Sequence, residues 1–213
     1  MRRLSLFDSL IDEIDAALRT LMPPKTRPST RRTPAASISE KSLNAAEKKH
    51  VAGLMRVNHS GEVCAQALYR GQALTAQLVE VKTQMTKAAA EEIDHLSWCE
   101  QRLDELNSQP SLLNPLWYFG SLMLGIVAGA AGDRVSLGFV AETEKQVSTH
   151  LQKHLRKLPA QDNKTRHILE QMHEDEMHHA DIAIAAGAVE LPEFIKQIMS
   201  AVSKLMTFSS YRF

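Results

Sequence analysis

The chain has 213 residues, enough to bury a sizeable hydrophobic core, and we expect one main domain. Hydrophobic residues make up 44% of it, with only 9 Gly and 8 Pro, which excludes a disordered or fibrous protein. The 25 basic residues balance the 25 acidic ones, so no global field attracts nucleic acid, and a nucleic-acid partner is not expected. The two cysteines lack zinc-site spacing, and a disulfide scaffold is excluded.

The first part of the chain predicts a short amphipathic helix followed by a linker. Apolar residues recur at helical spacing over 7–21, where a pair of prolines ends the pattern. Four of the eight prolines lie between residues 23 and 34, which is typical of a linker. Acidic residues follow the first arginines closely, and this favours a bacterial protein over one with a transit peptide. We therefore expect an N-terminal segment over 1–37 and the main domain over 38–213.

Six further helices are expected, and no strand pattern competes with them. Asn114 is a possible N-cap with Pro115 at the first helical position, and Gly187 followed by Pro192 separates the last two helices. The chain is thus predicted to be all-α, with main helices over roughly 43–78, 81–107, 115–131, 134–158, 162–187 and 192–206.

The segment from Asn107 to Gly132 carries no charged residue or histidine, so its helix has three possible placements. The helical part begins only at Leu116. At about 1.5 Å per residue it reaches roughly 26 Å, short of the roughly 30 Å hydrocarbon core of a membrane. It is therefore a helix buried in the fold, a helix lying in the membrane interface, or a membrane span. The helix over 192–206 favours the interface, because its apolar face lies beside two lysines.

Two helical segments contain the pattern Glu-x-x-His, in Glu92 with His95 and in Glu176 with His179. Spacing i, i+3 places both side chains of a pair on one face, and the rest of that face is apolar in both segments. A carboxylate in a core is costly unless it is paired or binds metal. The pair Asp175 and His178 has the same spacing but breaks the repeat described below, and is a weaker alternative.

Each Glu-x-x-His helix follows a helix that carries a core-facing glutamate. Glu144 lies on the apolar side of its helix, whereas Glu142 lies on a polar side, and Glu62 shares a mostly apolar face. The separation between Glu62 and Glu144 along the chain nearly equals the separation between the two Glu-x-x-His pairs. The chain therefore looks like two copies of one three-helix unit.

This residue set predicts a ferritin-like four-helix bundle with two additional short apolar helices. One Glu from each of two helices and Glu-x-x-His from each of the other two is the ligand set of di-iron and di-manganese carboxylate bundles. Two divalent ions would neutralise four carboxylates, so metal is expected to stabilise the fold. Carboxylate and imidazole suit iron or manganese. The predicted metal ligands and catalytic residues are Glu62, Glu92, His95, Glu144, Glu176 and His179.

Other polar residues near these six have subordinate roles. Asp94 and Asp181 are, by position, candidate acceptors for the ligand histidines. Cys99 is expected to pack in the core. The nearby histidines are expected at the surface or in satisfied core positions, with hydrogen bonding to ligands as the alternative; they are His59, His150, His173 and His178.

At these residues the chain resembles the bacterial demethoxyubiquinone hydroxylase family, from about residue 40 to the C-terminus. The resemblance implies a di-iron monooxygenase of ubiquinone biosynthesis that hydroxylates a polyprenyl methoxy-methyl-benzoquinol, and the family's six ligands map onto the six residues above. In one departure, relatives often place His-Tyr after the glutamate at position 144, whereas here Leu151 follows His150. The motifs are LMRVNHSGEVCAQALYRGQ at 54–72, EEIDHLSWCE at 91–100, DRVSLGFVAETE at 133–144 and EDEMHH at 174–179.

The resemblance also implies a reaction, partners and a location. Two iron ions per chain and dioxygen would deliver one oxygen atom to the ring and the other to water. The apolar helices over 115–131 and 192–206 would provide the route for a hydrophobic quinol, with peripheral attachment to the cytoplasmic side of a bacterial membrane. Expected partners are the quinol, membrane lipid and an electron donor, while a homo-oligomer and association with other enzymes of ubiquinone biosynthesis stay open. Anionic lipid would attract Arg2, Arg3, Arg31 and Arg32.

Three other functions share part of this pattern. An iron-storage or ferroxidase bundle needs a polar outer surface, which the uncharged segment after Asn107 opposes. A tRNA hydroxylase needs a basic face, but the chain is neutral. A non-catalytic quinone- or lipid-binding protein leaves the six ligands unexplained.

Overall fold

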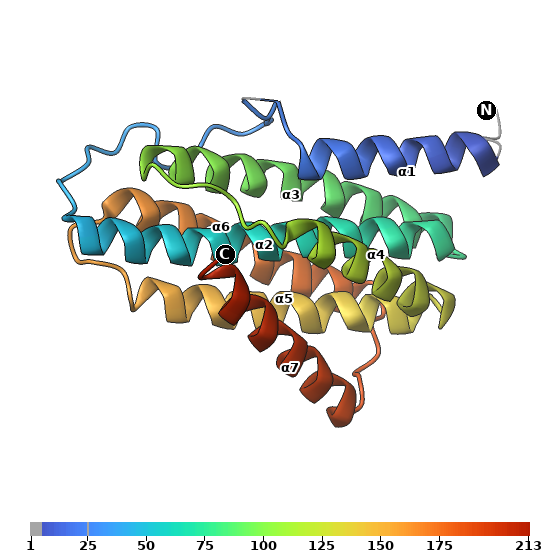
Figure 1. The fold of residues 1–213 in the computed structure, drawn as a ribbon. Coiled ribbons are helices and arrows are strands. Elements are labelled where there is room, and N and C mark those ends of the chain that lie inside the picture. Colours follow the sequence, from blue (N-terminus) through green and yellow to red (C-terminus); the bar gives the residue numbers. More distant parts are fainter. Residues whose placement is uncertain (1–5, 25) are drawn as a thin grey trace.

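The computed structural model describes residues 6–24 and 26–213, and in these residues the chain is helical, with no strand (Figure 1). The prediction of an all-α fold is confirmed, and the predicted helix ends lie within four residues of the observed ones. The helices are α1 (Leu6–Leu21), α2 (Ala45–Thr75), α3 (Val79–Glu105), α4 (Asn114–Ala130), α5 (Asp133–Leu155), α6 (Asn163–Ala185) and α7 (Glu193–Ser210).

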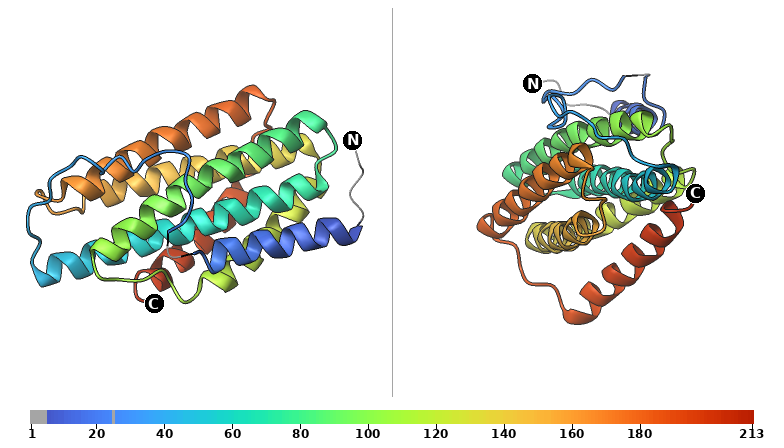
Figure 2. Two further views of the ribbon diagram at one scale, coloured as in Figure 1. Left: turned by 90° about the horizontal axis from the view of Figure 1, so that it is seen from above. Right: turned by 90° about the vertical axis from the view of Figure 1, so that its left-hand side faces the viewer.

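The four long helices α2, α3, α5 and α6 form the bundle, and α1, α4 and α7 lie on its outside (Figure 2). Large apolar side chains such as Trp98 and Leu169 fill the interior between them. The start of α2 is fixed by a capping box, in which the Asn44 side chain accepts from the Glu47 backbone N–H and the Glu47 carboxylate accepts from the Asn44 N–H. The expected ferritin-like bundle is therefore the observed architecture.

The start of α4 differs from the prediction. Pro115 lies in the first turn as expected, but Asn114 is not the N-cap. Its side chain instead accepts a hydrogen bond of 2.7 Å from Ser60 Oγ and contacts His59 Nδ1 at 3.1 Å, both on α2. These buried contacts use the amide that would otherwise cap the helix, so Asn114 joins α4 to α2.

Helix α4 has one packed face and one exposed face. A Cβ at Gly71 would collide with the backbone carbonyl of Leu122, and a Cβ at Gly125 with that of Leu68, so the backbones of α2 and α4 are in direct contact. The opposite face exposes large apolar side chains, which are Leu116, Phe119, Met123, Leu124 and Val127. A buried placement therefore accounts for only one side of this helix.

Within the described part of the chain, no helix combines the length and apolarity needed to cross a membrane.

Helix α7 is attached mainly through its C-terminal end and diverges from the bundle along the rest of its length (Figure 1). Arg56 on α2 donates to the Tyr211 carbonyl at 2.9 Å, and the Tyr211 hydroxyl lies 2.7 Å from His50 Nδ1. The Tyr211 ring packs so closely on Gly53 that a Cβ there would lie 2.5 Å from a ring carbon, and the ring would have to move. The outer face of α7 exposes Phe194, Ile198, Val202, Leu205 and Phe208.

Two histidines on α5 are kept neutral by their surroundings. The His150 and His154 ring centroids are 4.0 Å apart, and His154 Nδ1 donates to Asn58 Oδ1 at 2.8 Å. Burial, then repulsion from His150, lowers the pKa of His154 to about 2, while burial and nearby lysines lower the pKa of His150 to about 4. Unfolded histidine has a pKa of about 6.5. Stability due to neutral His154 is therefore complete above that pH and is lost as the pH falls below it.

We predict that His154→Gln makes the free energy of unfolding less sensitive to acid between about pH 6 and about pH 4, by up to about 1.4 kcal/mol per pH unit. The glutamine binds no proton when the chain unfolds, so this contribution to the slope disappears. Denaturant titrations at several pH values measure the slope. Substitution of the exposed His167 by Gln is the control and should leave the slope unchanged. Equal slopes in the wild type and His154→Gln would contradict the prediction.

Candidate metal centre

Six buried side chains from all four bundle helices meet in its interior, and they are the six that the sequence pattern predicted. The most exposed of them, His179, has only 8% of its surface accessible. The cluster consists of Glu62 from α2, Glu92 and His95 from α3, Glu144 from α5, and Glu176 and His179 from α6.

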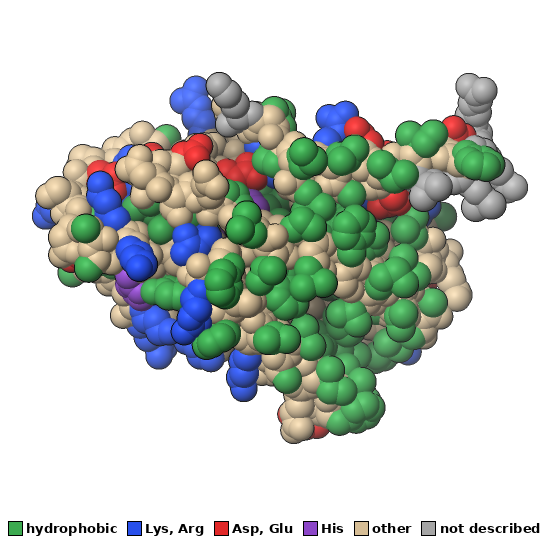
Figure 3. Space-filling view, viewed as in Figure 1, with side chains coloured by type: hydrophobic (Ala, Val, Ile, Leu, Met, Phe, Trp, Pro, Cys, Tyr) green, Lys and Arg blue, Asp and Glu red, His purple; other side chains and the backbone are tan. Residues whose placement is uncertain are grey.

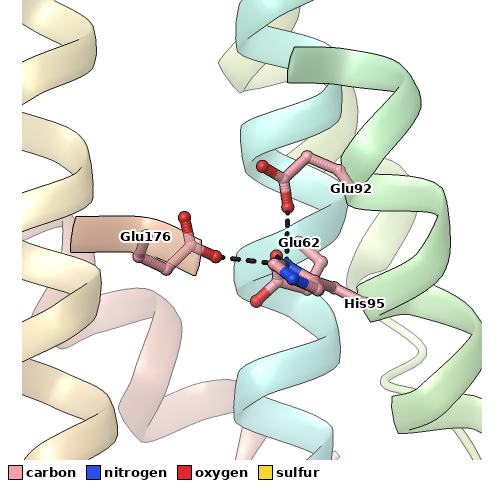
Figure 4. A group of neighbouring side chains, drawn as sticks. All are labelled: Glu62, Glu92, His95 and Glu176. Atoms are coloured by element: carbon pink, nitrogen blue, oxygen red, sulfur yellow. Dashed lines mark hydrogen bonds and ion pairs between the residues drawn. The ribbon is translucent and has the colours of Figure 1, made fainter. Parts of the chain in front are cut away.

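His95 points its Nδ1 atom into a group of three carboxylates (Figure 4). This nitrogen lies 3.1 Å from Glu92 Oε2, 3.2 Å from Glu176 Oε1 and 3.5 Å from Glu62 Oε2. In the other half, His179 Nδ1 lies 3.4 Å from Glu176 Oε2 and 3.6 Å from Glu92 Oε1. Glu92 and Glu176 thus contact both histidines.

The ligand atoms form two overlapping groups, each with all its atoms within 4.8 Å of one another. One group contains Glu62, Glu92, His95 and Glu176, and the other contains Glu92, Glu144, Glu176 and His179. Glu92 and Glu176 belong to both groups, so each of them could be a ligand in either half of the cluster.

The buried member of the Glu142 and Glu144 pair is the one that its helical face predicted. Glu144 is fully buried, whereas Glu142 is half-buried and accepts a hydrogen bond of 2.7 Å from Gln146 on its own helix. Residues two apart on a helix do not share a face, so only one of the two glutamates can enter the cluster.

Many ligand atoms of the cluster have no hydrogen-bond partner. These atoms are both carboxylate oxygens of Glu144 and of Glu176, one oxygen of Glu92, and Nδ1 of His179. Each unsatisfied buried polar group costs about 1–3 kcal/mol, and more when it is charged. Carboxylate oxygens and imidazole nitrogens bind iron and manganese, whose positive charge would satisfy these atoms. The donor set therefore fits a dinuclear metal centre.

The electrostatics of the cluster lead to the same conclusion. Burial raises the pKa of Glu62 and of Glu144 well above the usual carboxyl value, and repulsion adds to it, from Glu92 and Glu176 at Glu62 and from Glu176 at Glu144. Against the effect of burial, contacts with His179 and His95 lower the pKa of Glu176. Burial also opposes the charged form of His179, but its carboxylate neighbours raise its pKa to about 9. The cluster thus retains protons that metal binding would displace.

The outward nitrogen of each histidine binds a carboxylate from the opposite half of the repeat. His95 Nε2 donates to Asp175 Oδ2 at 2.8 Å, and His179 Nε2 donates to Glu91 Oε2 at 2.7 Å. Such a bond fixes the proton on Nε2 and leaves Nδ1 to face the cluster. Both acceptors were missed by the sequence analysis. The available signal was their position directly before the Glu of each Glu-x-x-His, at equivalent points of the two repeats.

The acceptors expected from sequence position are not the ones used. Asp94 accepts hydrogen bonds from Thr30 instead, and Asp181 is exposed. In the alternative pair, Asp175 binds His95 and His178 is exposed. Proximity along one helix favoured Asp94 and Asp181, whereas the real acceptors come from the facing helix.

The remaining residues near the cluster have structural contacts elsewhere, as expected. His59 is buried and lies 3.2 Å from Glu100 Oε1, and His173 Nδ1 lies 2.8 Å from Ser148 Oγ. Cys99 is buried in the apolar core.

An apolar groove of about 480 Å³ lies beside the cluster, between α2, α4, α5 and α7. Gly61 and Thr143, the neighbours of Glu62 and Glu144 in the chain, are part of its wall. Trp117 also lines the groove, and its Nε1 atom is buried without a hydrogen-bond partner. Most of the wall is apolar, including Leu68, Leu124, Phe139, Ile195, Met199 and Val202.

Known proteins are similar to this chain over nearly its whole length. A 3-demethoxyubiquinol 3-hydroxylase of Legionella pneumophila (strain Paris) is 65% identical over 211 residues, and a protein of the same name from Acinetobacter baumannii (strain SDF) is 60% identical over 211 residues. In both cases the match covers 99% of this chain and 99% of the relative. The family described as "Ubiquinone biosynthesis protein COQ7" matches residues 49–210, which include the whole cluster. The resemblance seen in the motifs is confirmed, and the chain belongs to the ubiquinone biosynthesis protein COQ7 family.

Proposed function

We propose that this chain is a 3-demethoxyubiquinol 3-hydroxylase that uses two iron ions and dioxygen to hydroxylate a polyprenyl methoxy-methyl-benzoquinol in ubiquinone biosynthesis. The observation that carries the proposal is the buried cluster with unsatisfied ligand atoms, in a chain whose full-length relatives bear that name. When bound, iron would supply the activation of dioxygen that side chains cannot. With two electrons from the expected electron donor and two protons, one oxygen atom would enter the ring and the other would leave as water.

The six cluster residues would hold the metals, and the helices around them would keep water away. Glu62 and His95 would belong to one ion and Glu144 and His179 to the other, with two shared glutamates between them. Four carboxylates match the charge of two divalent ions, so the occupied cluster is neutral and tolerates burial. The surrounding helices exclude bulk water, because every ligand side chain is buried.

The groove suits a quinol with an isoprenoid tail. Its volume of about 480 Å³ lies within the range of about 300–1,000 Å³ that is common for small-molecule sites. The apolar wall would take the ring and the first part of the tail. Trp117 Nε1 would donate to an oxygen of the quinol, because an indole N–H buried in an otherwise apolar wall favours an acceptor.

The outer surfaces of α1, α4 and α7 support peripheral attachment to a membrane. Apolar side chains spread over these three helices on one face of the molecule (Figure 3). They include Phe7, Ile11 and Leu18 of α1, each more than half exposed. Exposed apolar side chains gathered on one face favour the lipid interface. Since α4 and α7 also line the groove, a quinol would reach it from lipid without crossing water.

The expected arginine contribution to membrane binding needs correction at one residue. Arg31 forms ion pairs with Asp94 and Asp175 and is not free to bind lipid. Arg32 is exposed, whereas Arg2 and Arg3 lie outside the described residues.

We predict two iron ions per chain and loss of at least one in Glu144→Ala or Glu176→Ala. Removing one carboxylate leaves the metal charge under-compensated in a buried site. Metal analysis after anaerobic iron loading gives the stoichiometry. Glu142→Ala removes the same group two residues away and should keep both ions. Full iron content in the Glu144 and Glu176 variants would refute the ligand assignment.

The reaction is tested with iron-loaded protein, a short-tailed demethoxyquinol, a chemical reductant and isotopically labelled dioxygen. The product should contain one labelled oxygen atom. Trp117→Phe should raise KM by roughly twofold to thirteenfold, the effect of one lost hydrogen bond of about 0.5–1.5 kcal/mol, with little change in iron content. An unchanged KM would exclude Trp117 from substrate binding, and an unlabelled product would exclude the hydroxylase.

For membrane attachment, we predict that Phe119→Glu combined with Met123→Glu releases the protein from anionic liposomes. Both side chains are more than half exposed on α4, so the charges oppose insertion without disturbing the core. Co-sedimentation measures binding. The matched control combines Ile182→Glu with Ile184→Glu on α6, which lies on the other side of the bundle (Figure 2). Equal release of both double variants would show that this face is not the docking surface.

A further inference from the structure

The segment between α1 and α2 lies against α3, and we refer to its residues 26–36 as the strap. Arg27 anchors it: its guanidinium is buried, lies 2.7 Å from Glu100 Oε1 on α3, and donates to the Thr20 carbonyl of α1 at 2.9 Å. Trp98 on α3 donates to the Arg31 carbonyl at 3.3 Å. The proline-rich segment is thus fixed to the bundle at more than one point.

Arg31 extends from the strap to the carboxylate that binds His95. Its Nη1 lies 2.9 Å from Asp175 Oδ2, the same oxygen that accepts from His95 Nε2. Its Nε lies 3.1 Å from Asp94 Oδ2, and its guanidinium carbon lies 4.8 Å from the centre of the Trp98 ring. Its Nη2 also lies 3.4 Å from His95 Nε2. Four contacts therefore hold this guanidinium in one orientation beside Asp175 and His95.

Asp94 is itself held by the strap. The backbone N–H and the hydroxyl of Thr30 donate to its two oxygens at 2.7 and 2.8 Å. Because Asp94 is next to His95 on α3, the strap and the metal centre are joined through two carboxylates, one on α3 and one on α6. Bonds between an arginine and a carboxylate are directional as well as charged, so they fix position better than a lysine contact does.

The corresponding acceptor in the other half is less constrained. Glu91, which binds His179, has 36% of its side chain exposed, against 17% for Asp175. Its cationic neighbour is Lys87 at 3.5 Å, with 74% of its side chain exposed, and exposed pairs of this kind hold geometry weakly. The two halves thus have equivalent ligands, but the carboxylate that binds the histidine is held more firmly at Asp175 than at Glu91.

We propose that Arg31 is a positioning residue that makes the two metal positions inequivalent. By fixing Asp175 it orients His95 and strengthens the position formed by Glu62, Glu92, His95 and Glu176 over the one that contains His179. This inference rests on the metal centre proposed above. Outer partners of a ligand histidine typically change metal affinity 10- to 100-fold, so loss of Arg31 should weaken one position and spare the other.

The test is an anaerobic titration of the full-length, metal-free protein with Co²⁺, whose absorption spectrum reports each binding event. The wild type should bind two ions with separable affinities. Arg31→Met should weaken the tighter event by about tenfold or more and leave the weaker one within about twofold. Arg31→Lys should restore part of the loss, since it returns the charge without the planar fork. Arg32→Met, the same charge change at the exposed neighbouring residue, is the matched control.

The outcomes separate this inference from the proposed function. A wild type that binds neither cobalt nor iron would refute the metal centre itself. Two ions of equal affinity in the wild type, or equal weakening of both events in Arg31→Met, would refute the positioning role alone. Circular dichroism checks that each variant keeps its helical content. If Arg31→Met loses helical content, Arg31→Gln is titrated in its place. Selective weakening of one binding event in Arg31→Gln again supports the positioning role, whereas two unchanged binding events refute that role.

Discussion

Four carboxylates and two imidazoles placed between four packed helices are the constraint on which this structure depends. A buried charge is tolerated only when an opposite charge or hydrogen bonds compensate it. One buried residue of this bundle is fully compensated by other side chains. Arg102 is fully buried and binds Glu40, Asp162 and Thr165 at 2.6–3.0 Å. Glu144 is equally buried and has no hydrogen bond at either oxygen. The contrast between these two residues supports the proposal that a bound cation would complete the cluster.

Carboxylates outside the cluster bind its two histidines and connect the two halves of the repeat. Each ligand histidine comes from one half and its outer acceptor from the other, so α3 and α6 are tied together by two reciprocal hydrogen bonds. Each histidine is thus oriented by carboxylates of both halves. The symmetry ends at the strap, which covers the Asp175 side and leaves Glu91 more exposed. The strap, which precedes the repeat in the chain, thus makes the surroundings of His95 different from those of His179.

The outer helices form the apolar groove that we propose for the hydrophobic substrate. Direct backbone contact at Gly71 and Gly125 lets α4 pack against α2 through its small residues, while its large apolar side chains stay exposed on the opposite face. Helix α7 is held at its C-terminal end and diverges from the bundle, so the space between these helices is a groove and not a filled core. The groove reaches the chain neighbours of Glu62 and Glu144. The close contact of α4 with α2 and the divergence of α7 from the bundle thus place the apolar groove next to the charged cluster.

The sequence by itself determined the helices and the cluster. Helical periodicity assigns each residue to a face, so Glu144 could be separated from Glu142, and the regular spacing of the internal repeat paired the two Glu-x-x-His segments before any contact was known. Contacts between different elements carry no such periodic signal. The acceptors Asp175 and Glu91, the Asn114 contact with Ser60, and the reach of Arg31 to Asp175, far along the chain, depend on which surfaces meet when the bundle closes. Periodicity gives the direction of a side chain on its own helix, and only the tertiary structure decides which residue of another element it meets.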